Sequence, residues 1–108
     1  MEVETKSKIY ELLKENKIML FMKGNRTEPM CGFSARVIQI LNSLNTEYET
    51  FDVLEDPKIR EGIKEYGNWP TIPQLYHKGE LVGGCDIIVD LYRDGQLKEM
   101  VGELRKNF

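Results

Sequence analysis

The chain is organised around one short stretch, MCGFS at residues 30–34. An apolar run, Ile18 to Met22, precedes it, and residues with helical periodicity follow it, so Cys31 is expected where a strand meets a helix. The first N–H groups of a helix have no partner within the helix, and together with the helix dipole they favour a negative charge. This position predicts a lowered pKa for the Cys31 thiol and therefore a thiolate, which is both a nucleophile and a metal ligand.

The spacing within this stretch is that of a Cys-x-x-Cys redox pair, but Ser34 stands where the second cysteine would be. A hydroxyl cannot close a disulfide, so Cys31 lacks a resolving thiol one turn away. The other cysteine of the chain, Cys85, is distant in sequence. Two cysteines are too few for a disulfide framework, which indicates a reducing compartment.

Size and composition exclude several classes of function. The chain has 108 residues, enough for one domain with a modest core. Its net charge of -3 and the lack of a basic run argue against nucleic acid as a partner. Its apolar runs fall short of the roughly 20 residues that a membrane helix needs. The acidic N-terminus resembles neither a secretory signal nor an Arg-rich transit peptide, so we expect a cytoplasmic protein, with an organelle matrix after removal of a transit peptide as the alternative.

Hydrophobic periodicity and turn residues predict alternating helices and strands. Asp56 and Pro57 are typical of a helix start, Gly67 of a helix end, and Asp86 is expected to cap a later helix. The Lys78-Gly79 pair is typical of a tight hairpin turn. Helices are predicted over residues 4–15, 32–44, 57–66, 87–95 and 97–108, and strands over residues 18–23, 48–54, 74–77 and 80–83.

These elements predict an α/β fold. The two strands that flank the Cys31 helix should be parallel and joined by a right-handed crossover. The later hairpin adds antiparallel strands, which gives a four-stranded mixed sheet flanked by about five helices. A Cys-x-x-Cys-like motif at the first strand-to-helix junction of such a unit is typical of the thioredoxin-like fold.

Four segments carry a resemblance that covers nearly the whole chain: MKG at 22–24, CGFS at 31–34, WPTIPQL at 69–75 and GGCD at 83–86. In this order and spacing they resemble the monothiol glutaredoxins of the Cys-Gly-Phe-Ser class. The resemblance implies a single glutaredoxin domain over residues 1–108, glutathione binding, and a [2Fe–2S] cluster that bridges a homodimer. It also implies transfer of the cluster to iron–sulfur acceptor proteins and a BolA-like partner. The chain departs from the family at Asn25-Arg26, where a small residue and proline are usual, so we expect a less stiff loop.

The resemblance assigns roles to individual residues. Cys31 is the catalytic thiol and the metal ligand for a cluster shared with a second subunit. Lys23 and Arg60 hold the carboxylate at the glycine end of glutathione, although both could be ordinary solvated cations. Ile72 faces the cysteinyl part of glutathione with its backbone, and the peptide bond before Pro73 is cis.

The GGCD segment completes the implied glutathione site. The backbone N–H groups of Cys85 and Asp86 donate to the γ-glutamyl carboxylate, and the Asp86 carboxylate holds the neighbouring ammonium. The local signals also fit an ordinary hairpin end followed by a helix cap. Cys85 is either simply packed or, less favoured, a disulfide partner of Cys31, and it is not counted as a cluster ligand.

Residues outside these segments receive mainly structural predictions. Trp69 is expected near the dimer or partner surface, and His77 at the surface. The methionines that fall in apolar patterns, Met19, Met22 and Met100, are expected in the core.

Two functions of different classes remain open from the sequence. The first is a glutathione-ligated [2Fe–2S] carrier, since a cluster needs four thiolates and one chain offers one well-placed sulfur. The second is a thiol–disulfide oxidoreductase that removes glutathione from protein thiols through Cys31 alone, so a weak enzymatic activity is left open. A regulatory module that reports iron status is a third, weaker alternative.

Overall fold

The computed structural model describes residues 1–102. Its helices are α1 (Val3–Glu15), α2 (Gly32–Ser43), α3 (Pro57–Tyr66), α4 (Cys85–Arg93) and α5 (Gln96–Val101), with one 3-10 turn, η1 (Val53–Glu55). Its strands are β1 (Ile18–Met22), β2 (Glu49–Asp52), β3 (Gln74–His77) and β4 (Glu80–Gly83). Within these residues no helix is both long and apolar enough to cross a bilayer.

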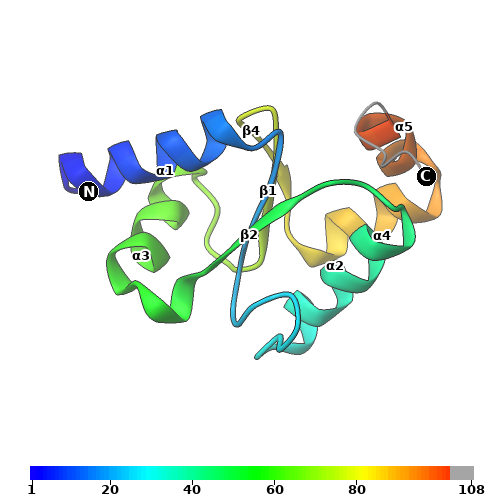
Figure 1. The fold of residues 1–108 in the computed structure, drawn as a ribbon, viewed down its shortest axis with the longest axis horizontal. Helices are drawn as coiled ribbons and strands as arrows, with labels where there is room; N and C mark the ends of the chain where they lie inside the picture. The colour runs from blue at the N-terminus through cyan, green and yellow to red at the C-terminus, as the bar shows by residue number, and fades with distance from the viewer. Residues whose placement is uncertain (103–108) are drawn as a thin grey trace.

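The four strands form one mixed sheet in the order β2-β1-β3-β4. Strand β1 pairs in parallel with β2 and antiparallel with β3, and β3 and β4 form the hairpin expected around Lys78-Gly79. Helices α1 and α3 cover one face of the sheet, and α2, α4 and α5 cover the other (Figure 1). The predicted thioredoxin-like architecture is therefore confirmed.

Strand β1 is buried along its whole length because the sheet is covered on both faces. Successive side chains of a strand point to opposite faces, so β1 supplies two separate cores. Met19 and Phe21 pack with α1 and α3, whereas Leu20 and Met22 pack with α2, α4 and α5. The prediction that Met19 and Met22 are core residues is confirmed, while Met100 is only partly buried against the second core.

Strand β2 is shorter than predicted because one carboxylate turns the chain. Asp52 Oδ1 accepts a 2.9 Å hydrogen bond from the N–H of Leu54 and another of 2.9 Å from the N–H of Gly24. The first bond starts η1, so residues 53–55 leave the strand. The second ties the end of β2 to the segment that leads to Cys31.

The predicted cap of α3 is confirmed, but that of α4 is wrong. Asp56 Oδ1 accepts bonds of 3.1 Å from the N–H groups of Lys58 and Ile59, and Pro57 follows at the first helical position. Helix α4 starts earlier than expected: Gly84 is its N-cap residue and Asp86 lies in its first turn, with no side-chain cap. A carboxylate in the first turn still suits the helix dipole, which explains why the sequence resembled a cap there. The predicted helix at residues 97–108 is described only as far as α5, since residues 103–108 lie outside the described range.

Candidate functional site

Cys31 lies at the residue before α2, as its position between strand and helix predicted. Its backbone is extended (φ -153°, ψ 136°), and its carbonyl accepts the first helical bond, from Ala35 N–H at 2.9 Å. The hydroxyl of Ser34, which is fully buried, accepts a 3.2 Å bond from the N–H of Lys23. Ser34, which stands where a Cys-x-x-Cys pair would have its second cysteine, therefore links the end of β1 to the start of α2.

The electrostatic surroundings of Cys31 favour its thiolate. Partial burial of the sulfur is the largest single influence and raises the pKa of this thiol. Hydrogen bonds from the backbone N–H groups of Ser34 and Phe33, the charge of Lys23 and the Ser34 hydroxyl all lower it, and together they prevail. The pKa of Cys31 is therefore below its ordinary value, as the helix start predicted.

The segment between β1 and Cys31 is a closed loop held by polar side chains. Gly24 and Pro29 form a bridge, and Met30 N–H donates to the Lys23 carbonyl at 2.9 Å. Asn25 Oδ1 accepts bonds from the N–H groups of residues 27 and 28 at 3.0 and 2.8 Å. The guanidinium of Arg26 donates to the Tyr48 carbonyl at 2.9 Å and lies 4.6 Å from the centre of the Tyr48 ring. Side-chain contacts thus restrain this loop.

A cavity of about 350 Å³ opens beside the sulfur of Cys31. Three cations line it: Lys23 at the end of β1, and Arg60 and Lys64 one turn apart on α3. The structure therefore brings together the two cations named from the sequence and adds Lys64, whose i, i+4 spacing from Arg60 was the signal that sequence reasoning missed. Lys64 also pairs with Glu61 at 3.1 Å.

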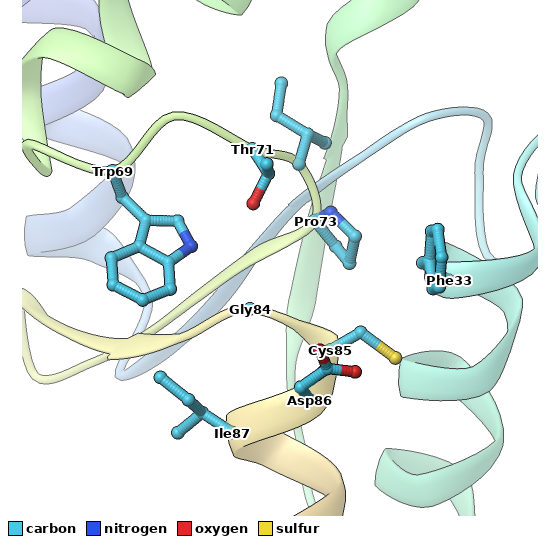
Figure 2. A pocket seen from close by; sticks show the side chains of 9 residues that line it. Phe33, Trp69, Thr71, Pro73, Gly84, Cys85, Asp86 and Ile87 are labelled. Carbon is cyan, nitrogen blue, oxygen red and sulfur yellow. The ribbon is translucent and has the colours of Figure 1, made fainter.

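A second cavity, of about 210 Å³, lies next to the first. Figure 2 shows Trp69 and Phe33 at opposite ends of it, with Pro73 between them. Its floor includes the start of α4, where Cys85 and Asp86 lie. The peptide bond between Ile72 and Pro73 is cis, as the resemblance implied.

The two cavities share Phe33, Thr71 and Ile72, so they form one groove across the start of α2. We use "the groove" for this combined surface. It brings together all six site residues named from the sequence: Lys23, Cys31, Arg60, Ile72, Cys85 and Asp86. Trp69, expected near the dimer or partner surface, lines the groove, and Ile87 is a lining residue that the sequence did not reveal.

The two cysteines of the groove differ in chemistry. Burial, followed by the carboxylate of Asp86, raises the pKa of the Cys85 thiol above its ordinary value. Cys31, by contrast, has a lowered pKa. The groove therefore presents two sulfurs, of which Cys31 ionises at a lower pH than Cys85.

These observations define the class of protein. A mixed sheet covered on both faces, a thiol at the start of the first crossover helix and a cis-proline loop beside it make this a thioredoxin-like protein with a monothiol site. The glutaredoxin family model matches residues 18–82, and the chain belongs to the glutaredoxin family.

Known relatives agree with the monothiol type. The chain is 57% identical to an uncharacterized monothiol glutaredoxin, ycf64-like, of Synechocystis sp., over 94% of each chain. It is 55% identical to the uncharacterized monothiol glutaredoxin ycf64 of Porphyra purpurea, over 96% of this chain and 97% of that protein. Among solved structures, reduced poplar apo GrxS14 is 47% identical with a TM-score of 0.81 and covers 92% of this chain and 91% of its own.

Proposed function

We propose that this monothiol glutaredoxin binds glutathione in the groove and acts as a carrier of a [2Fe–2S] cluster, with the cluster as its cargo. One observation supports the proposal above all others. A partly exposed sulfur with a lowered pKa lies in a groove with cations at one end and a helix start at the other.

The charges of the groove match those of glutathione. The cations Lys23, Arg60 and Lys64 suit the carboxylate at its glycine end. The free N–H groups at the start of α4 suit the γ-glutamyl carboxylate, and the Asp86 carboxylate suits the adjacent ammonium. Between these ends, the backbone of Ile72, which lines the groove beside the cis peptide bond, suits the cysteinyl part.

The residues present fit a shared cluster rather than one held by a single chain. A [2Fe–2S] cluster is held by four thiolates or their equivalents. Within residues 1–102 no three His, Cys, Asp or Glu side chains come together to hold a metal. Cys31 of each of two chains and the thiols of two glutathione molecules supply the required sulfurs, so the cargo implies a homodimer.

The proposal is tested by anaerobic reconstitution with iron, sulfide and glutathione, followed by the visible spectrum and the mass of the complex. We expect a coloured dimer for the wild type and for Cys85→Ser, and a colourless monomer for Cys31→Ser. Colour retained in Cys31→Ser, or lost equally in both variants, would contradict the role of Cys31.

Glutathione binding is tested separately by calorimetry on the metal-free protein. Lys23→Ala removes one of the three cations and should raise the dissociation constant about tenfold, because a charge-assisted bond to a carboxylate is lost. Lys98→Ala, an exposed change on α5, is the matched control and should leave the constant unchanged. Equal constants for the two variants would contradict the assignment of the cations.

A second function, as a thiol–disulfide oxidoreductase, is favoured by the same lowered pKa of Cys31. In that reaction the Cys31 thiolate attacks the glutathione sulfur of a protein–glutathione disulfide, and the protein leaves as a thiolate that takes up a proton. A second glutathione then attacks, as its thiolate, the glutathione sulfur of the mixed disulfide; the bond to Cys31 breaks, Cys31 leaves as a thiolate and glutathione disulfide is released. Rapid turnover of such a substrate by a colourless monomer would reverse the order of the two functions.

The rim of the groove suits docking of another protein. Met30 and Phe33 flank Cys31 and are 67% and 63% exposed, which is high for such large apolar side chains. We assign this rim to contacts with the second subunit, a BolA-like partner or an iron–sulfur acceptor protein. Pull-down of a BolA-like protein by the wild type and by Phe33→Ser tests this assignment, and equal capture would contradict it.

A further inference from the structure

A buried polar network lies beneath the loop that forms one wall of the groove. Its centre is Gln74, the first residue of β3, which has no exposed surface. The amide Nε2 of Gln74 donates to the carbonyls of Trp69 at 2.9 Å and Thr71 at 3.1 Å. Its Oε1 accepts a 2.9 Å bond from the hydroxyl of Tyr76, which is also buried. Both donors and the acceptor of the amide are thus used.

The same network contacts the end of α3. A Cβ atom on Gly67 would meet the Tyr76 hydroxyl and would lie 3.1 Å from Gln74 Oε1. The N–H of Trp69 donates to the carbonyl of Lys64 at 3.0 Å. The loop is therefore fastened to α3 at its start and to β3 through the amide of Gln74.

A polar side chain at this place needs a physical reason. Gln74 and Tyr76 lie two apart on β3, so they share the face of the sheet that α1 and α3 cover. Burying an amide there is unfavourable unless all its hydrogen bonds are made. The amide of Gln74 donates to the carbonyls of Trp69 and Thr71, which would otherwise face the interior without a hydrogen-bond donor.

Glutamine suits this position better than its isosteres. Glutamate would replace the donor with an acceptor facing two carbonyl oxygens, and methionine would keep the volume but make none of the three bonds. The requirement is thus for the amide itself and is not met by size alone.

We propose that Gln74, oriented by the Tyr76 hydroxyl, is a positioning residue for ligand binding: it sets the backbone of residues 69–72 so that Thr71 and Ile72 complete both halves of the groove. The inference rests on the proposed function, since the ligand is glutathione. Gln74 itself touches no ligand, because it is fully buried behind the loop.

The test uses Trp69, which is the only tryptophan of the chain and lies within the positioned loop. In the ligand-free protein, Gln74→Met should shift the Trp69 emission to longer wavelength and increase its quenching by acrylamide, because the loop opens to water. Tyr76→Phe should give a smaller shift, since both bonds to the loop carbonyls remain. Gln39→Met, an exposed change on α2, is the matched control and should leave the emission unchanged.

Glutathione affinity is then measured by calorimetry at a temperature where circular dichroism shows every variant folded. We expect the dissociation constant to rise about tenfold in Gln74→Met and about threefold in Tyr76→Phe. Val101→Ala weakens the opposite core at a fully buried position and serves as the control for lost stability. Its dissociation constant should equal that of the wild type.

The outcomes separate this inference from the proposed function. If the wild type binds glutathione and Gln74→Met binds it equally well, Gln74 has no positioning role, whatever the emission shows. If the wild type itself fails to bind glutathione, the proposed function is wrong and the positioning role for that ligand falls with it. Should Gln74→Met fail to fold, Tyr76→Phe decides: unchanged emission and affinity in that variant overturn the inference.

Discussion

The loop between Lys23 and Cys31 and the loop that carries Thr71 and Ile72 differ in the contacts that hold them. The cysteine loop, residues 24–30, lies at the surface and is restrained by exposed side chains, among them Asn25 and Arg26. The proline loop, residues 67–73, is restrained from beneath by Gln74 and Tyr76, which are buried.

The difference matters because burial decides what a hydrogen bond contributes. An exposed polar contact competes with water and contributes about 0 to 1 kcal/mol. Breaking a buried one leaves a partner without water or protein to bond and costs about 1 to 3 kcal/mol. The proline loop, with Thr71 and Ile72, is therefore the more firmly held of the two, and the cysteine loop, residues 24–30, is the one that can adjust.

The largest expected effect is that of Gly67→Ala in the proline loop. The new Cβ would collide with the Tyr76 hydroxyl and crowd Gln74, so we expect a loss of about 3 kcal/mol in the free energy of unfolding, measured with urea. Gly32→Ala is the matched control, since within residues 1–102 no atom other than those of its chain neighbours and its own helix backbone lies within 4 Å of its Cβ position, and it should change stability by less than about 0.5 kcal/mol.

A double variant sharpens this prediction. Combining Gly67→Ala with Tyr76→Phe removes the hydroxyl that the methyl group meets, so the two changes should be less than additive. Additive losses would show that the crowding at Gly67 has another source.

The two sulfurs of the groove should differ in reactivity. Alkylation by iodoacetamide is followed against pH in Cys85→Ser, which leaves Cys31, and in Cys31→Ser, which leaves Cys85. The midpoint for Cys31 should lie below the ordinary pKa of 9.0 because of its helix-start N–H groups and Lys23. That for Cys85 should lie above 9.0 because of burial. At neutral pH Cys31 should react several-fold faster.

The lowered pKa also has a consequence for stability. Since the pKa of Cys31 is lower in the folded chain than in the unfolded one, its thiolate stabilises the fold above the unfolded pKa. This contribution is lost as the pH falls through the folded value. The free energy of unfolding is measured against pH in Cys85→Ser and in the double variant that also carries Cys31→Ser. The double variant should lack this pH dependence. The same pH dependence in both variants would contradict the lowered pKa of Cys31.

The smallest expected effect is that of Arg26→Ala in the cysteine loop. It removes an exposed ion pair with Glu49 at 3.2 Å and the contact with the Tyr48 ring, so we expect a loss of about 1 kcal/mol at low salt. Part of the loss should vanish at high salt because the ion pair is screened. Glutathione affinity should stay within about twofold of the wild type, far from the change expected for Gln74→Met.

Arg93→Ala, an exposed change on α4, is the control for removal of a positive charge. A loss for Arg26→Ala as large as that for Gly67→Ala would remove the distinction between the two loops.

Much of this protein could be predicted from residues that act locally. Asp56 and Pro57 start α3 through bonds to their immediate neighbours, so the sequence revealed that boundary. Asp86 was wrongly predicted to cap α4, because the helix dipole favours a carboxylate in the first turn as well as at the cap. Strand β2 was predicted to run to residue 54 because its β-branched and aromatic residues continue that far, whereas the Asp52 carboxylate starts η1 by accepting a bond from the N–H of Leu54.

The sequence by itself determined the order of strands and helices, the placement of Cys31 at a helix start and the identity of the six groove residues. The first two follow from periodicity and turn chemistry, and the six residues from the family resemblance that the four motifs carry. Only the tertiary structure decided that Lys64 joins Lys23 and Arg60, that two cavities meet at Thr71 and Ile72, and that Gln74 supports the loop from behind. Such features depend on which surfaces face one another after the sheet is assembled, and no local pattern records that.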